Sequence, residues 1–187
     1  MELKSDITLT GECWQIAEDK LHNRLFKSQW GIFKLCLTIG ILYDKQLDDV
    51  GDTKDATAPM NIPRTMFNRN SKDMQVCFQT AILTSNCIDL SEKDRLYLAF
   101  SEDISEDDLD GEDADVLKIG VSDNALSFDK SGFLRKFANY GVTKIVDCIT
   151  DNDIETMENI RDFIKDSIDG TTDEMIDLYS VEDIDEI

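Results

Sequence analysis

The sequence lacks the residues and motifs on which most enzymes depend. It contains a single histidine, His22. The nucleophile motif GxSxG, the phosphate-binding loop, the dinucleotide motif GxGxxG and the zinc motif HExxH are all absent. We expect His22 to be a surface or boundary histidine, although Cys13 lies close in sequence and leaves a Cys–His pair open. No catalytic residue and no cofactor are predicted, and the protein is not expected to be an enzyme.

Long apolar runs and paired cysteines are absent as well. No run of about 18 apolar residues occurs, so no membrane span is expected. The first residues, Met1–Lys4, lack the basic and apolar pattern of a secretory signal. The five cysteines are odd in number and include no CxxC pair, which argues against a disulfide framework. We therefore expect reduced, mostly buried thiols in a cytosolic protein.

A metal site is not predicted either. The opening of a calcium-binding loop is suggested by Glu106, Asp108, Asp110 and Gly111. The last position of such a loop needs a bidentate glutamate, and Leu117 stands there instead. One histidine and scattered cysteines also argue against a zinc site.

Charge is distributed very unevenly along the chain. The net charge is -21. Residues 1–100 hold 14 acids and 12 bases, whereas residues 101–187 hold 26 acids and 7 bases. The C-terminal half therefore repels phosphate backbones and attracts basic surfaces, so direct binding to nucleic acid is not expected. The simpler alternative is that the acids only keep the protein soluble.

Apolar residues recur at helical spacing through most of the chain and predict a mainly α fold. Helices are expected near residues 10–25, 28–42, 71–83, 91–100, 133–140 and 154–168. Ser28, Ser71 and Ser91 are the expected N-caps, and Gly141 is the expected C-terminal cap of its helix. Alternating apolar residues within 116–128 (Leu117, Ile119 and Val121) predict a short strand or extended segment.

Two polar stretches divide these helices. Residues 44–63 are predicted to be a loop or short linker. Nine of the fourteen residues in 102–115 are acidic, which predicts a solvated linker. We therefore expect two small helical parts, namely a near-neutral helical domain at 1–101 and a smaller acidic part at 116–170, with an acidic and apolar tail at 171–187. The helices that contain Gly31–Ile41 and Gly132–Val142 resemble each other, and an internal duplication stays open.

Two sets of residues are candidate contact sites. A small basic patch is suggested by Lys20, Arg24, Lys27, Arg64, Arg69 and Lys72, although ordinary helix surface charge is the simpler interpretation. The tail combines apolar groups with acids, as expected of a segment that docks into a basic-rimmed groove. The tail residues in question are Met175, Ile176, Asp177, Leu178, Tyr179, Glu182 and Asp183. The alternative is that the tail packs on the chain's own helices.

The segment Leu25–Gly40 resembles the "F-x-S/T-x-x-D-x-F-x-x-A-x-x-x-G" helix of small proteins encoded with bacterial DNA-phosphorothioation and other phage-defence systems. The match covers about a tenth of the chain. It departs from the pattern at Gly31, and at Cys36 or Leu37, where the family has polar and alanine residues. The resemblance implies an accessory component of a defence complex and carries over no catalytic residue.

Two functions follow as hypotheses. The first is a non-catalytic adaptor that binds other proteins, within a bacterial phage-defence complex. The second is an acidic inhibitor, such as an immunity protein, an antitoxin or a DNA mimic, that covers a basic nucleic-acid-binding surface. In both, the partner is a protein with a basic surface and no membrane is involved, while a homo-oligomer stays open. A DNA mimic should carry its acids in regular rows on a folded surface.

Overall fold

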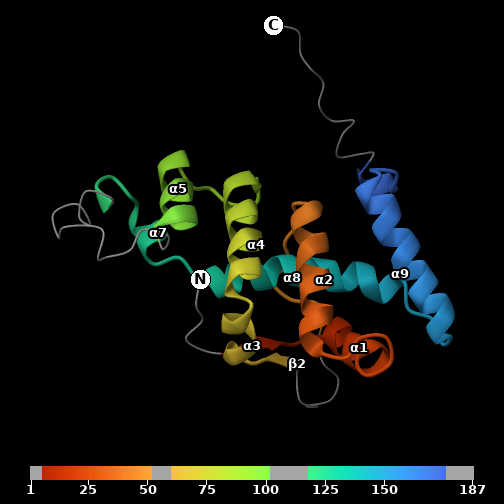
Figure 1. Ribbon diagram of the computed structural model, residues 1–187. Helices are drawn as coiled ribbons and strands as arrows, with labels where there is room; N and C mark the ends of the chain where they lie inside the picture. Colours follow the sequence, from red (N-terminus) through yellow and green to blue (C-terminus); the bar gives the residue numbers. More distant parts are fainter. Residues whose placement is uncertain (1–5, 52–59, 102–117, 176–187) are drawn as a thin grey trace, which may run out of the picture.

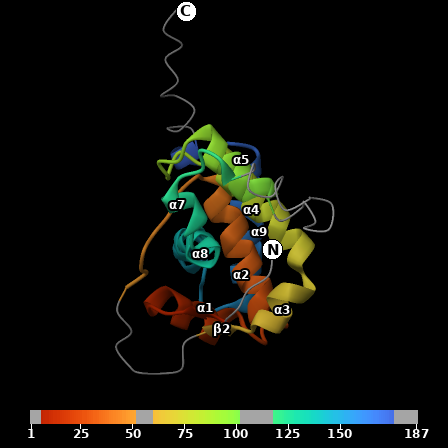
Figure 2. The same ribbon diagram turned by 90° about the vertical axis from the view of Figure 1, so that its left-hand side faces the viewer.

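The computed structural model describes residues 6–51, 60–101 and 118–175, and within them the fold is mainly helical, as predicted. Two short strands, at residues 7–9 and 60–62, pair as a small antiparallel sheet, with Ile7 opposite Ile62. Figures 1 and 2 show the arrangement from two sides. The elements are β1 (Ile7–Leu9), α1 (Glu12–Leu21), α2 (Gln29–Leu42), β2 (Met60–Ile62), α3 (Arg64–Arg69), α4 (Ser71–Thr84), α5 (Glu92–Phe100), α7 (Asp123–Leu126), α8 (Lys130–Asp147) and α9 (Asp153–Ile168).

Helices α2 and α8 cross at the centre of the molecule, and the other elements surround this pair (Figure 1). Two glycines allow the close approach. A Cβ atom on Gly141 would overlap the backbone of Cys36, and a Cβ atom on Gly40 would overlap the backbone of Phe137. The two contacts are reciprocal: each helix places its glycine against the backbone of the other helix four residues before that helix's own glycine, at Cys36 in α2 and at Phe137 in α8. The resemblance between the two helices thus coincides with a symmetric crossing.

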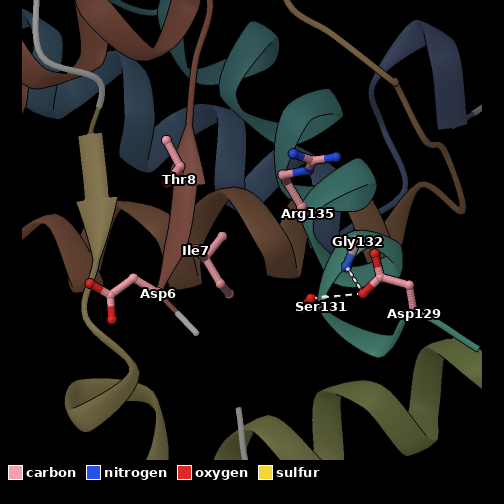
Figure 3. Close-up of a pocket in the computed structure, with 7 residues that line it drawn as sticks. All are labelled: Asp6, Ile7, Thr8, Asp129, Ser131, Gly132 and Arg135. Carbon is pink, nitrogen blue, oxygen red and sulfur yellow. Dashed lines mark hydrogen bonds between the residues drawn. The ribbon is translucent and has the colours of Figure 1, made fainter. Parts of the chain in front are cut away.

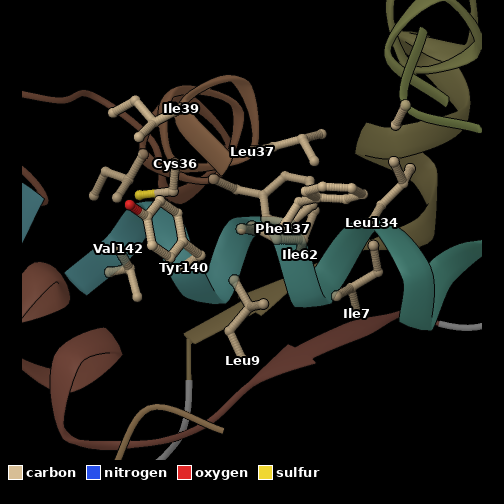
Figure 4. Packing of buried hydrophobic residues seen from close by; sticks show 14 of the residues in the cluster. Ile7, Leu9, Cys36, Leu37, Ile39, Ile62, Leu134, Phe137, Tyr140 and Val142 are labelled. Carbon is tan, nitrogen blue, oxygen red and sulfur yellow. The ribbon is translucent and has the colours of Figure 1, made fainter. Parts of the chain in front are cut away.

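The predicted division of the chain does not correspond to two cores. The buried side chains form one cluster, to which the first part contributes Trp14 and Phe33 and the second part contributes Phe137 and Ile145. Figure 4 shows side chains of α2, α8 and both strands packed together. The predicted acidic linker, 102–115, lies outside the described residues. The helical parts on either side of it share a core because α8 is the main packing surface for α2.

Local signals located some helix ends and missed others. The Ser28 and Ser91 hydroxyls accept hydrogen bonds from the backbone N–H groups of Gly31 and Asp94, which confirms both predicted caps. Ser71 is not an N-cap, because it is the first residue of α4 and Asn70 precedes it as the capping position. The short helix α3, which the sequence did not predict, ends at Arg69 directly before this junction.

Two further predictions about the second half were wrong. Gly141 does not end a helix, because α8 continues to Asp147 and buries this glycine against α2. The described part of 116–128 forms no strand; α7 occupies Asp123–Leu126, and Ile119 is exposed. At Gly141 the tertiary contact with α2 outweighs the local pattern.

The predicted polar loop 44–63 is anchored where the structure describes it. Asn139, which is buried on α8, donates hydrogen bonds to the carbonyl oxygens of Leu47 and Asp48, both at 3.1 Å. Its side-chain oxygen accepts a hydrogen bond from Trp14 Nε1 at 2.9 Å. One amide side chain therefore joins α1, the loop and α8, and it leaves no donor hydrogen of its own unpaired. Residues 60–62 at the end of the loop form β2.

The cysteines are free thiols, and their burial varies. Cys36 and Cys148 are buried, Cys13 and Cys77 are partly buried, and Cys87 is exposed. The expectation of mostly buried thiols therefore fails at Cys87. Within the described ranges, no helix is both long enough and apolar enough to cross a membrane.

Candidate partner-binding surface on helix α9

The single histidine, His22, is bound to a carboxylate of the chain itself. Nδ1 of His22 lies 2.7 Å from Oε1 of Glu18, one helical turn earlier, and Gln29 Nε2 donates to the same oxygen at 2.9 Å. The ring is thus held by a carboxylate of α1, at whose C-terminal cap His22 lies. In the part of the chain that the structure describes, no group of three or more His, Cys, Asp or Glu residues could hold a metal ion.

A polar recess of about 250 Å³ lies where β1 meets the start of α8 (Figure 3). Asp129 accepts hydrogen bonds from the Gly132 N–H at 2.9 Å and from the Ser131 hydroxyl at 2.8 Å, so its carboxylate caps α8. Asp6 caps α3 in a similar way, through the Arg64 N–H at 2.9 Å.

Both carboxyl groups of this recess are unsuited to proton transfer near neutral pH. The backbone hydrogen bond from Gly132 lowers the pKa of Asp129, and the backbone hydrogen bond from Arg64 lowers the pKa of Asp6. Each carboxyl group is therefore ionised, and each already accepts a hydrogen bond from the backbone N–H at a helix start. The Ser131 hydroxyl does bond to the Asp129 carboxylate, but the same carboxylate oxygen also accepts the Gly132 N–H as the cap of α8.

The predicted basic patch is partly neutralised by the chain itself. Lys20 pairs with Asp151 and Arg24 pairs with Asp153, both at 3.2 Å. These ion pairs join the end of α1 to the start of α9. The other four cations, Lys27, Arg64, Arg69 and Lys72, are exposed and lie before α2, at the two ends of α3 and in the first turn of α4. Two of the six predicted patch residues therefore pair with the start of α9.

The start of the predicted docking tail belongs to the core. Met175 is only 1% exposed. Next to it, the Glu174 carboxylate accepts hydrogen bonds from Lys45, Lys144 and Tyr140. Burial alone would raise the pKa of Glu174, but these hydrogen bonds lower it to about 2. Met175 is thus not a surface contact, and the other tail candidates (Ile176, Asp177, Leu178, Tyr179, Glu182 and Asp183) lie outside the described residues.

The excess negative charge of the described residues is concentrated around α9. All described residues together hold 23 acids and 17 bases, a net charge of -6. Residues 151–174 alone hold nine acids and two bases, a net charge of -7. The rest of the described chain is therefore close to neutral. The negative potential of the folded part comes from one helix and its flanks, which stand at the edge of the molecule (Figure 1).

Helix α9 has three faces. The inner face packs on the body through Thr156, Ile160, Phe163 and Ser167. An acidic row on the outer side consists of five exposed residues, Glu155, Glu158, Asp162, Asp166 and Asp169. Because successive members lie three or four positions apart, they share one side of the helix over roughly 21 Å.

Between these two faces lies an apolar strip. Ile154, Met157 and Ile168 are 66%, 54% and 71% exposed, and Ile164 beside them is half-buried. In the sequence, Met157 and Ile168 share helical spacing with Ile160, but only Ile160 is buried. The width of the apolar arc on this helix could have predicted an exposed strip. A surface helix that packs on one side needs an apolar stripe only a little over 100° wide, and these residues cover more than that.

No protein-family model matches the chain, and no curated protein or solved structure matches it. Its function therefore has to be inferred from the chemistry of its own surface.

Proposed function

We propose that the protein is a non-catalytic, cytosolic binding protein, and that its partner is another protein with a basic surface. The acidic row of α9 is the contact element. The observation that carries this proposal is the concentration of negative charge on one helix and its flanks, at the edge of an otherwise near-neutral fold.

The electrostatics of α9 suit the capture of a cationic partner. Glu158, Asp166 and Asp169 have no ion-pair partner among the residues that the structure describes. Their carboxylates are therefore available to an incoming cation. In about 0.15 M salt, screening acts over roughly 8 Å, so carboxylates one or two helical turns apart act together on an approaching surface. Such a field raises the association rate more than it raises the affinity.

Two biological settings fit a partner of this kind. The resemblance of Leu25–Gly40 to phage-defence accessory proteins favours an adaptor within a defence complex. The regular spacing of the acidic row favours the second setting, an inhibitor that covers a nucleic-acid-binding surface, because a phosphate backbone also presents evenly spaced negative charges. The two differ in whether duplex DNA or RNA competes with the protein for its partner.

The experiment uses the tagged full-length chain as bait in an extract of its native cells. Identified partners are then purified and their affinity is measured directly. The test variant carries Glu158→Gln, Asp166→Asn and Asp169→Asn, which removes three charges from α9. The matched control carries Asp49→Asn, Asp89→Asn and Glu92→Gln, which removes three exposed charges elsewhere.

We expect the α9 variant to bind at least about tenfold more weakly, mainly through a slower association rate, and the control to bind like the wild type. Removing acids near the C-terminal end of α9 does not weaken that helix, because negative charge there opposes the helix dipole. Equal binding of both variants would refute the assignment to α9. Competition by duplex nucleic acid would assign the inhibitor role, and its absence would assign the adaptor role.

A further inference from the structure

The apolar strip of α9 has the spacing of a helix-packing seam. Ile154, Met157, Ile164 and Ile168 occupy positions that alternate by three and four residues if Arg161 is included at the centre. Three of these apolar side chains are more than half exposed. Helix α9 stands at the edge of the molecule (Figure 1), and its helical spacing places the strip beside the acidic row. Ile164 also touches the core, whereas Ile154, Met157 and Ile168 stay exposed among the residues that the structure describes.

We propose that this strip receives an amphipathic α-helix of the partner, whose apolar face lies on the strip and whose basic side chains reach the acidic row. The inference rests on the function proposed above and specifies the element of the partner that is bound. The strip supplies apolar anchors, which set the residence time, and the row supplies the charge that selects a basic helix.

The spacing of the strip favours a helix over an extended segment. Its side chains are separated by steps of about 4.5 and 6 Å along the axis, which another helix matches with its own three- and four-residue steps. On one face of a strand, successive side chains are about 6.6 Å apart, so an extended peptide would fall out of step along the strip.

Charge also argues against a second copy of the chain as the occupant. Pairing two α9 helices would bring together two elements that each carry a net charge of -7 with their flanks. That net charge already includes the central cation, Arg161, which pairs with Asp162 on its own helix at 2.9 Å. With a basic helix as the occupant, the electrostatic interaction becomes attractive, and the five carboxylates of the acidic row lie beside it.

The experiment measures the binding of a labelled synthetic peptide to the purified full-length protein by fluorescence anisotropy. The probe is a Leu/Lys peptide of about 18 residues, roughly 27 Å long as a helix, with leucines on one face. A second peptide has the same composition in an order that spreads its leucines around the helix. The strip variant is Ile154→Ser with Ile168→Ser, and the matched control is Val76→Ser with Leu96→Ser, which changes exposed apolar residues of α4 and α5.

We expect the amphipathic peptide to bind about tenfold more tightly than the rearranged one, and the strip variant to lose that advantage while the control keeps it. Equal affinity for the two peptides, or unchanged affinity in the strip variant, would overturn the assignment of a helix to the strip. The proposal of a partner with a basic surface would then be decided by the capture experiment alone. No binding of either peptide would overturn it as well. A concentration-dependent dimer that only the strip variant abolishes would assign the strip to a second copy instead.

Discussion

Replacing Gly141 by alanine should destabilise the protein, although alanine is ordinarily the better helix former. Gly141 lies inside α8, and at an uncrowded helix position the exchange would stabilise the helix by about 1 kcal/mol. Here the added Cβ would lie 2.8 Å from the Cα atom of Cys36 and closer still to its carbonyl oxygen. Carbon atoms in ordinary contact are about 3.5 to 4.0 Å apart, so the helices must separate by roughly 1 Å.

The cost follows from what that separation disturbs. Overpacking a core usually costs about 1–3 kcal/mol, and side chains often absorb part of it by changing rotamer. At this crossing the opposing atoms belong to the backbone of α2, which cannot do so. We expect the free energy of unfolding to fall by about 2 kcal/mol or more after the gain in helix propensity is subtracted. The melting temperature should fall by about 4–8 °C, at about 2–4 °C per kcal/mol for a chain of this size.

Chemical and thermal denaturation of three variants tests this reasoning. Gly40→Ala should behave like Gly141→Ala, and the double variant should cost less than their sum, because the first methyl group already separates the helices. Gly31→Ala is the control, since its Cβ would meet only side-chain atoms, of Phe26 at 3.2 Å and of Ser28 at 3.8 Å, and no backbone. A stabilising effect of Gly141→Ala, or an effect no larger than that of the control, would show that α2 and α8 are not in backbone contact there.

Three further predictions concern the contacts that hold the periphery. Met175→Ala should lower the free energy of unfolding by about 2–5 kcal/mol, whereas Met157→Ala, at an exposed site, should change it little; similar values for both in urea titrations would place Met175 outside the core. Arg95→Lys should cost about 1–3 kcal/mol, because Arg95 donates to the carbonyl oxygens of Ile82 in the last turn of α4 and of Ser85, Ile88 and Leu90 after it, and lysine cannot reach all four. The exposed Arg69→Lys is its control, and an equal effect of the two would contradict the capping role. Glu174→Gln should lose stability near neutral pH. Because folding lowers the pKa of Glu174 from 4.5 to about 2, its contribution is complete above pH 4.5 and is lost as the pH falls towards 2. The difference in unfolding free energy between wild type and Glu174→Gln should therefore shrink over that range, and a constant difference would refute the assignment.

Local signals were sufficient where the structure depends on neighbours in sequence. The Ser28 and Ser91 caps were predictable because each hydroxyl bonds a backbone N–H three residues later. The same approach failed at Gly141, where a contact with a residue more than 100 positions away keeps a glycine inside a helix. It also failed at Ile119 and Val121, whose alternation matches a strand although no partner strand is present among the described residues.

The candidate site was predictable only in its chemistry. The sequence indicated an acidic C-terminal half, because charge adds up along the chain whatever the fold. The basic surface of a partner stays a prediction. It placed the contacts in the tail at Met175 and beyond, whereas Met175 is buried and the exposed apolar strip lies on α9. The period of α9 shows that apolar residues occupy a broad arc, but not which part of that arc the body covers.

The sequence alone thus determined helical content, charge asymmetry and the absence of recognisable catalytic motifs, since these depend on composition and short-range spacing. Only the tertiary structure decided that α2 and α8 share one core and that Gly40 and Gly141 mark their crossing. It also decided that Lys20 and Arg24 bind the flank of α9 rather than a free ligand. These outcomes depend on which distant surfaces meet, and burial of apolar area together with close backbone packing selects that arrangement.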